Sequence, residues 1–424
     1  MKFSKLKLGL ISIGLIASSQ LVFADNALEN MKQMKVASSD ASLPLVPQSG
    51  KNADAIRANL QKVKLPEGFH IDLYAIVPDA RHMAVAPSTN MLFVGTRKQT
   101  LWAVTNRNNG DMATEVKPFA PSLNFRNPNG VCWTKDGFLV VAETNRVLNF
   151  PAAEFFYEGA DVAVIEVVPE GKLIPVANES YNHTARTCKV SADGKLYITL
   201  GQPYNVQPQD KIAEFEKIGI GGVISMNPFD GSDRVVVARG MRNPVGLTIA
   251  KDGSIWTTDN QTDGMGDDTP PGELNKLGPV GSHYGYPWYS GRTKVTDAAA
   301  GYKLSQMAEP KNIVMPEVEF APHAADLGLT VYNGKKFPAK YQGGVFVAEH
   351  GSWNRSTPIG YRVMYVPIKD GHAGKAEVFA DGFLDKETGL AMGRPVDVAE
   401  MKDGSILVSD DYAGAIYRIS YTGK

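Results

Sequence analysis

The fold of this chain is decided by one short motif, a tight turn followed by a short apolar strand. The motif is clearest as TKDGFLVVAE at residues 134–143 and as MKDGSILVSDD at residues 401–411. Asp-Gly favours a tight turn, and the β-branched and aromatic run after it favours a β-strand. Further copies, one of them diverged, are PSTNMLFVG (87–95), SADGKLYITLG (191–201), AKDGSIWTTDN (250–260) and AKYQGGVFVAEHG (339–351).

The six copies recur along most of the chain, starting near residues 87, 134, 191, 250, 339 and 401. Strand-only units of this length predict an all-β fold, a six-bladed β-propeller with four-stranded antiparallel blades over residues 61–424. An irregular β-sandwich is the alternative, but units that recur in sequence favour the propeller. The fourth interval is the longest, and we expect its residues 264–315 to form an excursion between two blades.

The composition is that of a globular protein and excludes two classes. A hydrophobic content of 43% excludes bulk disorder. The chain has 44 Lys and Arg against 45 Asp and Glu, a net charge of -1, so it lacks the basic balance typical of nucleic-acid binding.

The N-terminal residues predict export. Three lysines precede an apolar stretch over residues 8–22, and Ala24 ends a small-residue cleavage site, so residues 1–24 are predicted to be a signal peptide and the mature protein to be periplasmic. A membrane anchor is the alternative, but the stretch is short for a span, and no later segment is long and apolar enough for one. Residues 25–60 are predicted to be a loose leader. Cys132 and Cys188, the only cysteines, could pair after export, although their spacing does not demand it.

Polar loops next to the turn–strand units should converge at one end of the propeller channel. Their sequences are FRNPNG (125–130), YNHTAR (181–186), MRNPVG (241–246), EHGSWNR (349–355) and GRPVD (393–397). A turn into a strand accounts for Asn-Pro-x-Gly itself. The arginines add several cations at one channel mouth, which predicts an anionic ligand with several carboxylates or phosphates. They are Arg126, Arg186, Arg242, Arg355 and Arg394.

Two further features indicate chemistry. His183 is a candidate general base because nearby arginines would keep its ring unprotonated; His350 is a weaker rival, and a structural histidine is the alternative. Residues 259–268 are acidic and Gly-rich, which suits Ca²⁺ and suits a solvated acidic loop equally well.

The sequence resembles the soluble quinoprotein sugar dehydrogenases from about Leu65 to Ile419. The residues that carry the resemblance are Asn182-His183 followed by LYITLG, Arg242-Asn243-Pro244, Glu273-Leu274-Asn275 followed by YGYP at 284–287, and Arg394-Pro-Val-Asp397. Residues 349–355, EHGSWNR, are most similar to the sorbosone dehydrogenase-like branch.

This resemblance implies a site that binds pyrroloquinoline quinone (PQQ) and Ca²⁺. The reaction would oxidise an aldose or a sorbosone-like sugar aldehyde by hydride transfer from C1 to the quinone. His183 would be the base, Ca²⁺ the Lewis acid, and Arg242 would stabilise the reduced quinone. The remaining cofactor contacts would come from Arg126, Asn243, Arg355 and Arg394, and the metal would be bound by backbone carbonyls of Gln261 and Thr262.

An external electron acceptor, a cytochrome or a quinone, would complete the reaction cycle. Two alternatives remain open at the level of sequence. One is a Ca²⁺-dependent propeller lactonase, which has no need for many arginines. The other is a non-catalytic propeller that binds a protein or glycan.

Overall fold

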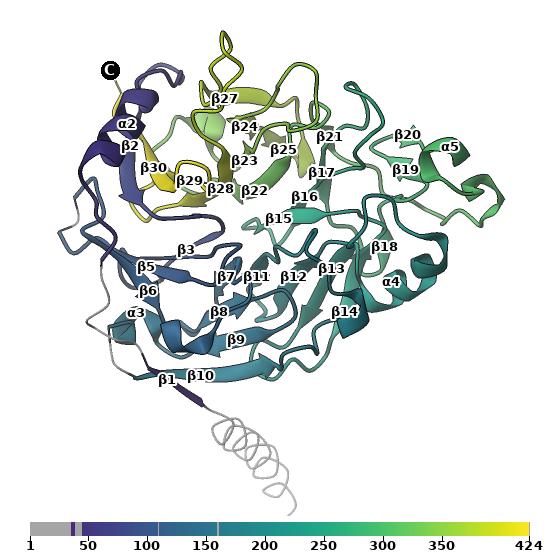
Figure 1. Cartoon of the computed structure of the whole chain (residues 1–424), viewed down its shortest axis with the longest axis horizontal. Helices are drawn as coiled ribbons and strands as arrows, with labels where there is room; N and C mark the ends of the chain where they lie inside the picture. The colour runs from purple at the N-terminus through teal and green to yellow at the C-terminus, as the bar shows by residue number, and fades with distance from the viewer. Residues whose placement is uncertain (1–34, 39–44, 109, 159–160, 424) are drawn as a thin grey trace, which may run out of the picture.

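The computed structural model is a six-bladed β-propeller, as the repeat predicts (Figure 1). It describes residues 35–38, 45–108, 110–158 and 161–423. The predicted signal peptide lies outside the described residues. No helix among the described residues is long and apolar enough to cross a membrane.

Each blade is an antiparallel four-stranded sheet, and the first strands of successive blades contact one another in a closed ring around the axis. Blades one to three comprise β3 (Met83–Val85), β4 (Leu92–Val94), β5 (Leu101–Thr105) and β6 (Glu115–Phe119); β7 (Gly130–Trp133), β8 (Leu139–Ala142), β9 (Val147–Phe150) and β10 (Asp161–Val168); and β11 (Cys188–Val190), β12 (Leu196–Leu200), β13 (Gly222–Met226) and β14 (Val235–Arg239). Blades four to six comprise β15 (Pro244–Ile249), β16 (Ile255–Asp259), β17 (Glu273–Lys276) and β21 (Val318–Glu319); β22 (Asp326–Val331), β23 (Val345–Glu349), β24 (Arg362–Val366) and β27 (Glu377–Asp381); and β28 (Pro395–Glu400), β29 (Ile406–Asp410), β30 (Ala415–Tyr421) and β2 (Phe69–Ile76).

The remaining elements are short and lie outside this ring. β1 (Lys35–Ser38) adds to β10, and β18 (Ser282–His283) adds in parallel to β14. Two small hairpins pair β19 (Tyr289–Ser290) with β20 (Thr293–Lys294) and β25 (Ile368–Lys369) with β26 (His372–Ala373). The helices are α2 (Lys51–Leu60), α3 (Ala153–Phe156), α4 (Ile212–Ile218) and α5 (Asp297–Ala300), with single 3₁₀ turns at Pro121–Leu123, Val176–Asn178, Gln209–Lys211, Leu304–Gln306 and Ala339–Tyr341.

The two ends of the propeller sequence meet in the sixth blade. Strand β2 pairs antiparallel with β30, from Phe69 opposite Tyr421 to Ile76 opposite Ala415. This pairing joins the first propeller strand to the last and closes the ring, so the sixth sheet is completed by a strand from the opposite end of the sequence.

The segment predicted to be a loose leader contains helix α2. Ala53, Ile56 and Leu60 recur on one face of this helix, and all three are buried against the core of the fifth and sixth blades. The expectation of irregular structure therefore does not hold for residues 51–60, because this apolar face is covered.

The long excursion lies inside the fourth blade rather than between two blades, which corrects the sequence-based expectation. The chain leaves the sheet after β17 and returns in β21, which pairs with β17 itself. Between them, Trp288, Ala300 and Leu304 form a small core with Ile212 of α4. The length of the interval showed that an insertion exists, but only strand pairing shows which two strands it separates.

Apolar side chains fill the spaces between neighbouring blades. One such cluster joins Val140 and Ala142 of β8 to Leu196 and Ile198 of β12. In the same region Cys132 of β7 and Cys188 of β11 form a disulfide, with their Cα atoms 5.8 Å apart. The pairing that the sequence left open is thus present, and it joins the inner strands of the second and third blades.

Candidate functional site

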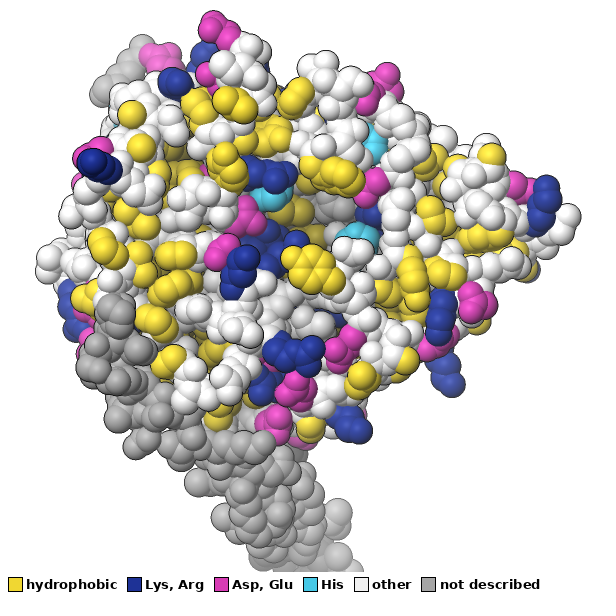
Figure 2. All heavy atoms as spheres, viewed as in Figure 1, with side chains coloured by type: hydrophobic (Ala, Val, Ile, Leu, Met, Phe, Trp, Pro, Cys, Tyr) yellow, Lys and Arg dark blue, Asp and Glu magenta, His cyan; other side chains and the backbone are white. Residues whose placement is uncertain are grey.

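The candidate site is a polar hollow at one end of the propeller channel. Figure 2 shows basic, acidic and histidine side chains gathered around a depression near the centre of this face. A pocket of about 140 Å³ opens there, lined by loops of the third, fourth and fifth blades. Its lining includes His183, Arg242, Asn260, Gln261, Asp263, His323 and Asn354.

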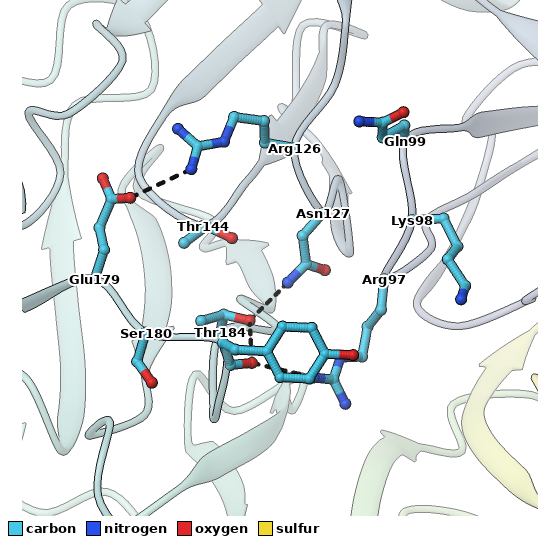
Figure 3. A pocket seen from close by; sticks show the side chains of 10 residues that line it. Arg97, Lys98, Gln99, Arg126, Asn127, Thr144, Glu179, Ser180 and Thr184 are labelled. Carbon is cyan, nitrogen blue, oxygen red and sulfur yellow. Dashed lines mark hydrogen bonds and ion pairs between the residues drawn. The ribbon is translucent and has the colours of Figure 1, made fainter.

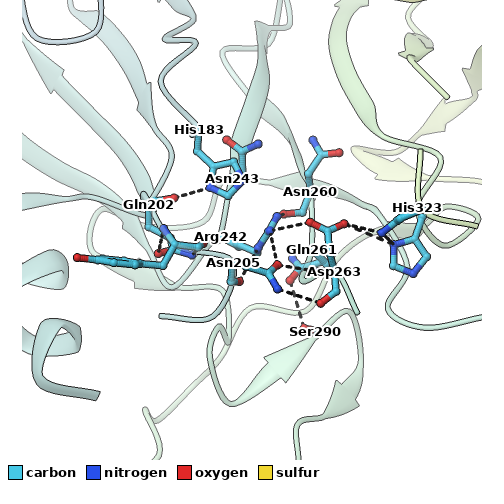
Figure 4. A network of polar contacts seen from close by, with 12 residues as sticks. His183, Gln202, Asn205, Arg242, Asn243, Asn260, Gln261, Asp263, Ser290 and His323 are labelled. Atoms are coloured by element: carbon cyan, nitrogen blue, oxygen red, sulfur yellow. Dashed lines mark hydrogen bonds and ion pairs between the residues drawn. The ribbon is translucent and has the colours of Figure 1, made fainter. Parts of the chain in front are cut away.

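The ring of His183 is held in one tautomer by the loop that follows β12. Its Nδ1 lies 2.5 Å from the carbonyl oxygen of Gln202 (Figure 4). Because a carbonyl only accepts, Nδ1 carries the hydrogen, and Nε2 of the neutral ring retains a lone pair that can accept a proton. His183 itself has φ 52°, a left-handed conformation that is uncommon for a residue with a side chain.

The pKa of His183 is lowered to about 4. Burial is the largest cause, followed by the positive charge of Arg242, with smaller contributions from Arg97 and Arg186. The ring is therefore neutral at neutral pH, which is the protonation state that a general base needs.

Arg242 is buried in the wall of the same pocket, with 2% of its surface exposed. Its guanidinium donates to the carbonyl oxygen of Asn205 at 2.9 Å and to that of Asn260 at 2.9 Å, and forms an ion pair with Asp263 at 3.2 Å. These contacts fix the cation next to His183, and Figure 4 shows the whole network.

The backbone at residues 242 and 243 is anchored by a carboxylate from the adjacent strand. The N–H groups of Arg242 and Asn243 donate to the two oxygens of Asp259, at 3.0 and 2.7 Å. The side chain of Asn243 lies against Gly201, where a Cβ would come within 2.5 Å of Asn243 Oδ1 and 2.7 Å of the His183 carbonyl oxygen. A glycine at 201 therefore allows the two loops to approach.

Gln261 and Thr262, the predicted metal-binding positions, are both buried beside this network. The side-chain amide of Gln261 donates to Asp259 at 2.9 Å and to Glu273 at 2.8 Å. Burial raises the pKa of both carboxyls, and the charge of Asp259 raises that of Glu273 further. Within the described ranges, no three His, Cys, Asp or Glu side chains form a group that could bind a metal ion.

Arg394 lies at the channel mouth, in contact with the loop after β23. It donates to the carbonyl oxygens of His350 at 3.1 Å and Gly351 at 2.8 Å, and its guanidinium lies 5.6 Å from the centre of the Tyr361 ring. His350, the rival base, is engaged by Asp411, whose Oδ1 lies 2.7 Å from its Nε2. His350 is not among the residues that line the pocket with His183 and Arg242.

The other predicted arginines occupy different surroundings. Arg355 contacts the carbonyl oxygens of Asp267 and Pro322 and comes within 3.7 Å of the Asp268 carboxylate. Arg186 is buried beneath the His183 loop, where it donates to the carbonyl oxygens of Thr144 and His183. It thus supports the loop from below.

Arg126 is not brought to the His183 pocket. It forms ion pairs with Glu170 at 2.7 Å and Glu179 at 3.4 Å and lines a second pocket (Figure 3). The related motifs at residues 126–130 and 242–246 therefore place their arginines differently. Arg126 pairs with Glu170 and Glu179, whereas Arg242 pairs with Asp263 in the His183 pocket.

Sequence reasoning missed several residues of the network, notably Gln202, Asn205 and His323. They lie in loops without a distinctive motif and meet the site only through the fold. One sequence signal does point to this network: an acid follows or ends the second strand of several blades. Asp259 accepts the N–H of Arg242, and Asp410 in the same way accepts that of Arg394 at 2.8 Å.

The chain matches known proteins along most of its length. The family model described as TrAA12-like matches residues 63–422. A stretch of 250 residues is 36% identical to an uncharacterized protein of Borreliella burgdorferi, covering 58% of this chain and 62% of that protein. A stretch of 276 residues is 24% identical to the PQQ-dependent pyranose dehydrogenase of Coprinopsis cinerea, covering 54% of this chain and 37% of that enzyme.

The chain therefore spans less than two thirds of the length of these relatives. Among solved structures, the holo form of the Coprinopsis cinerea pyranose dehydrogenase PQQ domain superimposes with a TM-score of 0.67 at 18% identity, covering 84% of this chain and 97% of that one. The fold is thus shared, and the resemblance is confirmed as far as relatedness to the PQQ-dependent pyranose dehydrogenase; the sorbosone dehydrogenase-like branch is not specifically shown.

Proposed function

We propose that this chain, which belongs to the TrAA12-like family, oxidises the C1 carbon of an aldose or a sorbosone-like sugar aldehyde with PQQ bound at the channel mouth. One observation supports this proposal most strongly. His183 is neutral, presents a free Nε2, and lies beside the buried cation of Arg242 in a single pocket. The PQQ dependence of the Coprinopsis relative supports the choice of cofactor.

The basic residues of the mouth suit an acidic, planar cofactor. Arg394 donates to backbone carbonyls only, and it forms no ion pair within the described part of the chain. Arginine has five N–H donors in a planar fork that fits a carboxylate, so Arg394 has capacity for an anionic partner. Arg394, Arg355, Asn243 and Arg242 are the residues that would hold the cofactor. Arg126 would need to leave its two glutamates to take part.

The proposal assigns Ca²⁺ to the carbonyl oxygens of Gln261 and Thr262. A nearby carboxylate supports a cation here: Asp326 is fully buried, and neither of its oxygens has a hydrogen-bond partner in the part of the chain that the structure describes. It lies against Gly272, which lines the pocket, since a Cβ at 272 would come within 1.8 Å of Asp326 Oδ2. Oxygen donors of these kinds are those that Ca²⁺ prefers, and the ion would supply Lewis acidity.

The chemistry assigned to this chain is removal of a proton and stabilisation of charge. Nε2 of His183 takes the proton of the sugar C1 hydroxyl while the C1–H bond breaks. The two electrons leave C1 as a hydride, for which bound PQQ supplies the acceptor. The guanidinium of Arg242 stabilises the negative charge that develops next to it during this hydride transfer. The sugar leaves as a lactone, or as an acid if it entered as a hydrated aldehyde, and an external acceptor, a cytochrome or a quinone, takes up the electrons.

Reconstitution tests this proposal directly. Addition of PQQ and Ca²⁺ to the cofactor-free protein is expected to change the PQQ absorbance and to produce dye reduction with members of an aldose and sorbosone panel. Chelation of Ca²⁺ should lower the activity and its return should restore it. The absence of both an absorbance change and dye reduction would contradict the proposal, as would metal-dependent lactone opening without PQQ.

A further inference from the structure

A second, larger pocket lies next to the candidate site and has no role in the proposed chemistry. Its volume is about 590 Å³, within the range of about 300–1,000 Å³ that small-molecule sites occupy. It is lined by four loops, which follow β4, β6, β8 and β10, and most of the side chains in its lining are polar (Figure 3). One wall is the loop that contains His183, since Glu179, Tyr181 and Thr184 line this pocket.

The pocket carries an excess of positive charge on one side. On the other side Arg126 and Glu179 pair with each other. Arg97 and Lys98 lie opposite them (Figure 3), and neither forms an ion pair within the described residues. The guanidinium of Arg97 makes only a 3.4 Å contact with the carbonyl oxygen of Tyr181 and lies 5.8 Å from the centre of that ring. Two cations are thus available to an anionic group.

The rest of the lining suits sugar hydroxyls. Gln99, Thr144 and Ser180 supply neutral donors and acceptors. Asn127 donates to Thr184 at 2.8 Å, but its Oδ1 is buried and has no hydrogen-bond partner among the described residues. A ligand hydroxyl could donate to this acceptor. Tyr181 is 88% exposed, so its ring can pack against the apolar face of a sugar.

The two pockets share a lining loop, residues 179–184. Tyr181 and His183 belong to one loop, and the charge of Arg97 helps to lower the pKa of His183. A saccharide whose reducing end lies at His183 would therefore extend its next unit toward Arg97 and Lys98.

We propose that the substrate is an acidic saccharide, with a carboxylate on the unit next to the one that is oxidised, and that this carboxylate binds Lys98 and Arg97. The inference rests on the proposed function and narrows its substrate class. The carboxylate forms charge-assisted hydrogen bonds with the two cations, while Asn127 and the neutral lining residues bind hydroxyls.

The test compares cellobiouronic acid, a reducing disaccharide with a terminal uronic acid, with cellobiose, its neutral counterpart. In the PQQ-reconstituted protein, kcat/KM for the acid is expected to exceed that for cellobiose by about tenfold, and to fall with added salt. Lys98→Ala should remove most of this preference without changing kcat/KM for cellobiose, and Lys98→Glu should reverse it. Lys369→Ala, at an exposed lysine of β25, is the matched control and should change neither value.

A binding measurement separates this inference from the proposed function. Cellobiouronic acid reduced to its alditol cannot be oxidised at C1, and calorimetry should show that it binds the cofactor-free protein in a Lys98-dependent manner. Binding of the alditol without oxidation of any saccharide would contradict the proposed function, but it would support carboxylate binding in the second pocket. Equal kcat/KM values for the two disaccharides, equal effects of Lys98→Ala on both, or no binding of the alditol would overturn the inference.

Discussion

At the scale of single residues, the neighbours of His183 determine its tautomer and its pKa. The Gln202 carbonyl fixes its tautomer, and burial together with Arg242 lowers its pKa to about 4. His350 contacts Asp411 through its Nε2 and does not line the pocket that holds His183 and Arg242. The two histidines therefore differ in their surroundings and not in their intrinsic chemistry.

The pKa of His183 can be measured in the cofactor-free protein. Its ring is expected to titrate near pH 4 rather than near its ordinary value of 6.5, and Arg242→Gln should raise that pKa by removing a cation. Since the folded-state pKa lies below the unfolded one, this histidine makes folding less favourable as pH falls from about 6.5 toward 4. Ring NMR signals followed against pH give the measurement. Arg292→Gln, at an exposed arginine of the excursion, is the control; a His183 titration near 6.5 would count against the assignment.

The role of His183 as base predicts a specific kinetic defect. His183→Ala is expected to lower turnover of the reconstituted enzyme by roughly 10²- to 10⁴-fold, because a positioned base contributes about that much. The absorbance change on PQQ binding should persist, since His183 is not assigned to the cofactor carboxylates. Stopped-flow reduction of bound PQQ measures both. If His350→Ala produced the larger loss, the base would have to be reassigned to His350.

At the scale of elements, a few side chains fix how neighbouring blades and loops meet. Asp259 and Asp410 end second strands and accept the N–H groups of Arg242 and Arg394, so each arginine is tied to its own blade. The disulfide between Cys132 and Cys188 performs a similar task for the inner strands β7 and β11.

Loss of this disulfide should weaken the whole propeller measurably. The two cysteines lie 56 residues apart, and closing a loop of that length in the unfolded chain corresponds to about 4 kcal/mol in the chain-entropy model. The Cys132→Ala/Cys188→Ala variant is expected to lose that much free energy of unfolding in urea denaturation. Reduced wild-type protein should lose a similar amount, and an unchanged urea midpoint would contradict this role.

At the scale of the whole molecule, the ring is closed by one strand pair from its two ends. Strands β2 and β30 complete the sixth blade, and Ile419 is buried in the core they share. Their pairing brings residues from opposite ends of the sequence together, so we expect the molecule to be stable only as a complete ring.

Removal of β30 tests this closure. A chain ending at Gly414 is expected to lose its cooperative thermal transition, because β2 and β29 would both become unpaired edges. Ile419→Val is the matched control; it should keep the transition at a cost of about 0.5–1.5 kcal/mol. Thermal unfolding followed by circular dichroism compares the unchanged chain, the truncated chain and the Ile419→Val variant. A cooperative transition of the truncated chain would show that β30 is dispensable.

The sequence by itself determined the architecture of this protein, because each turn–strand unit folds through local preferences and its recurrence reveals the number of blades. It also placed His183, Arg242 and Gln261 in loops that meet in one pocket. Only the tertiary structure decided that Arg126 pairs with glutamates elsewhere, that Cys132 and Cys188 join, and that the excursion lies within the fourth blade. These features depend on contacts between residues far apart in the chain, and such contacts exist only once the blades and their loops have packed together.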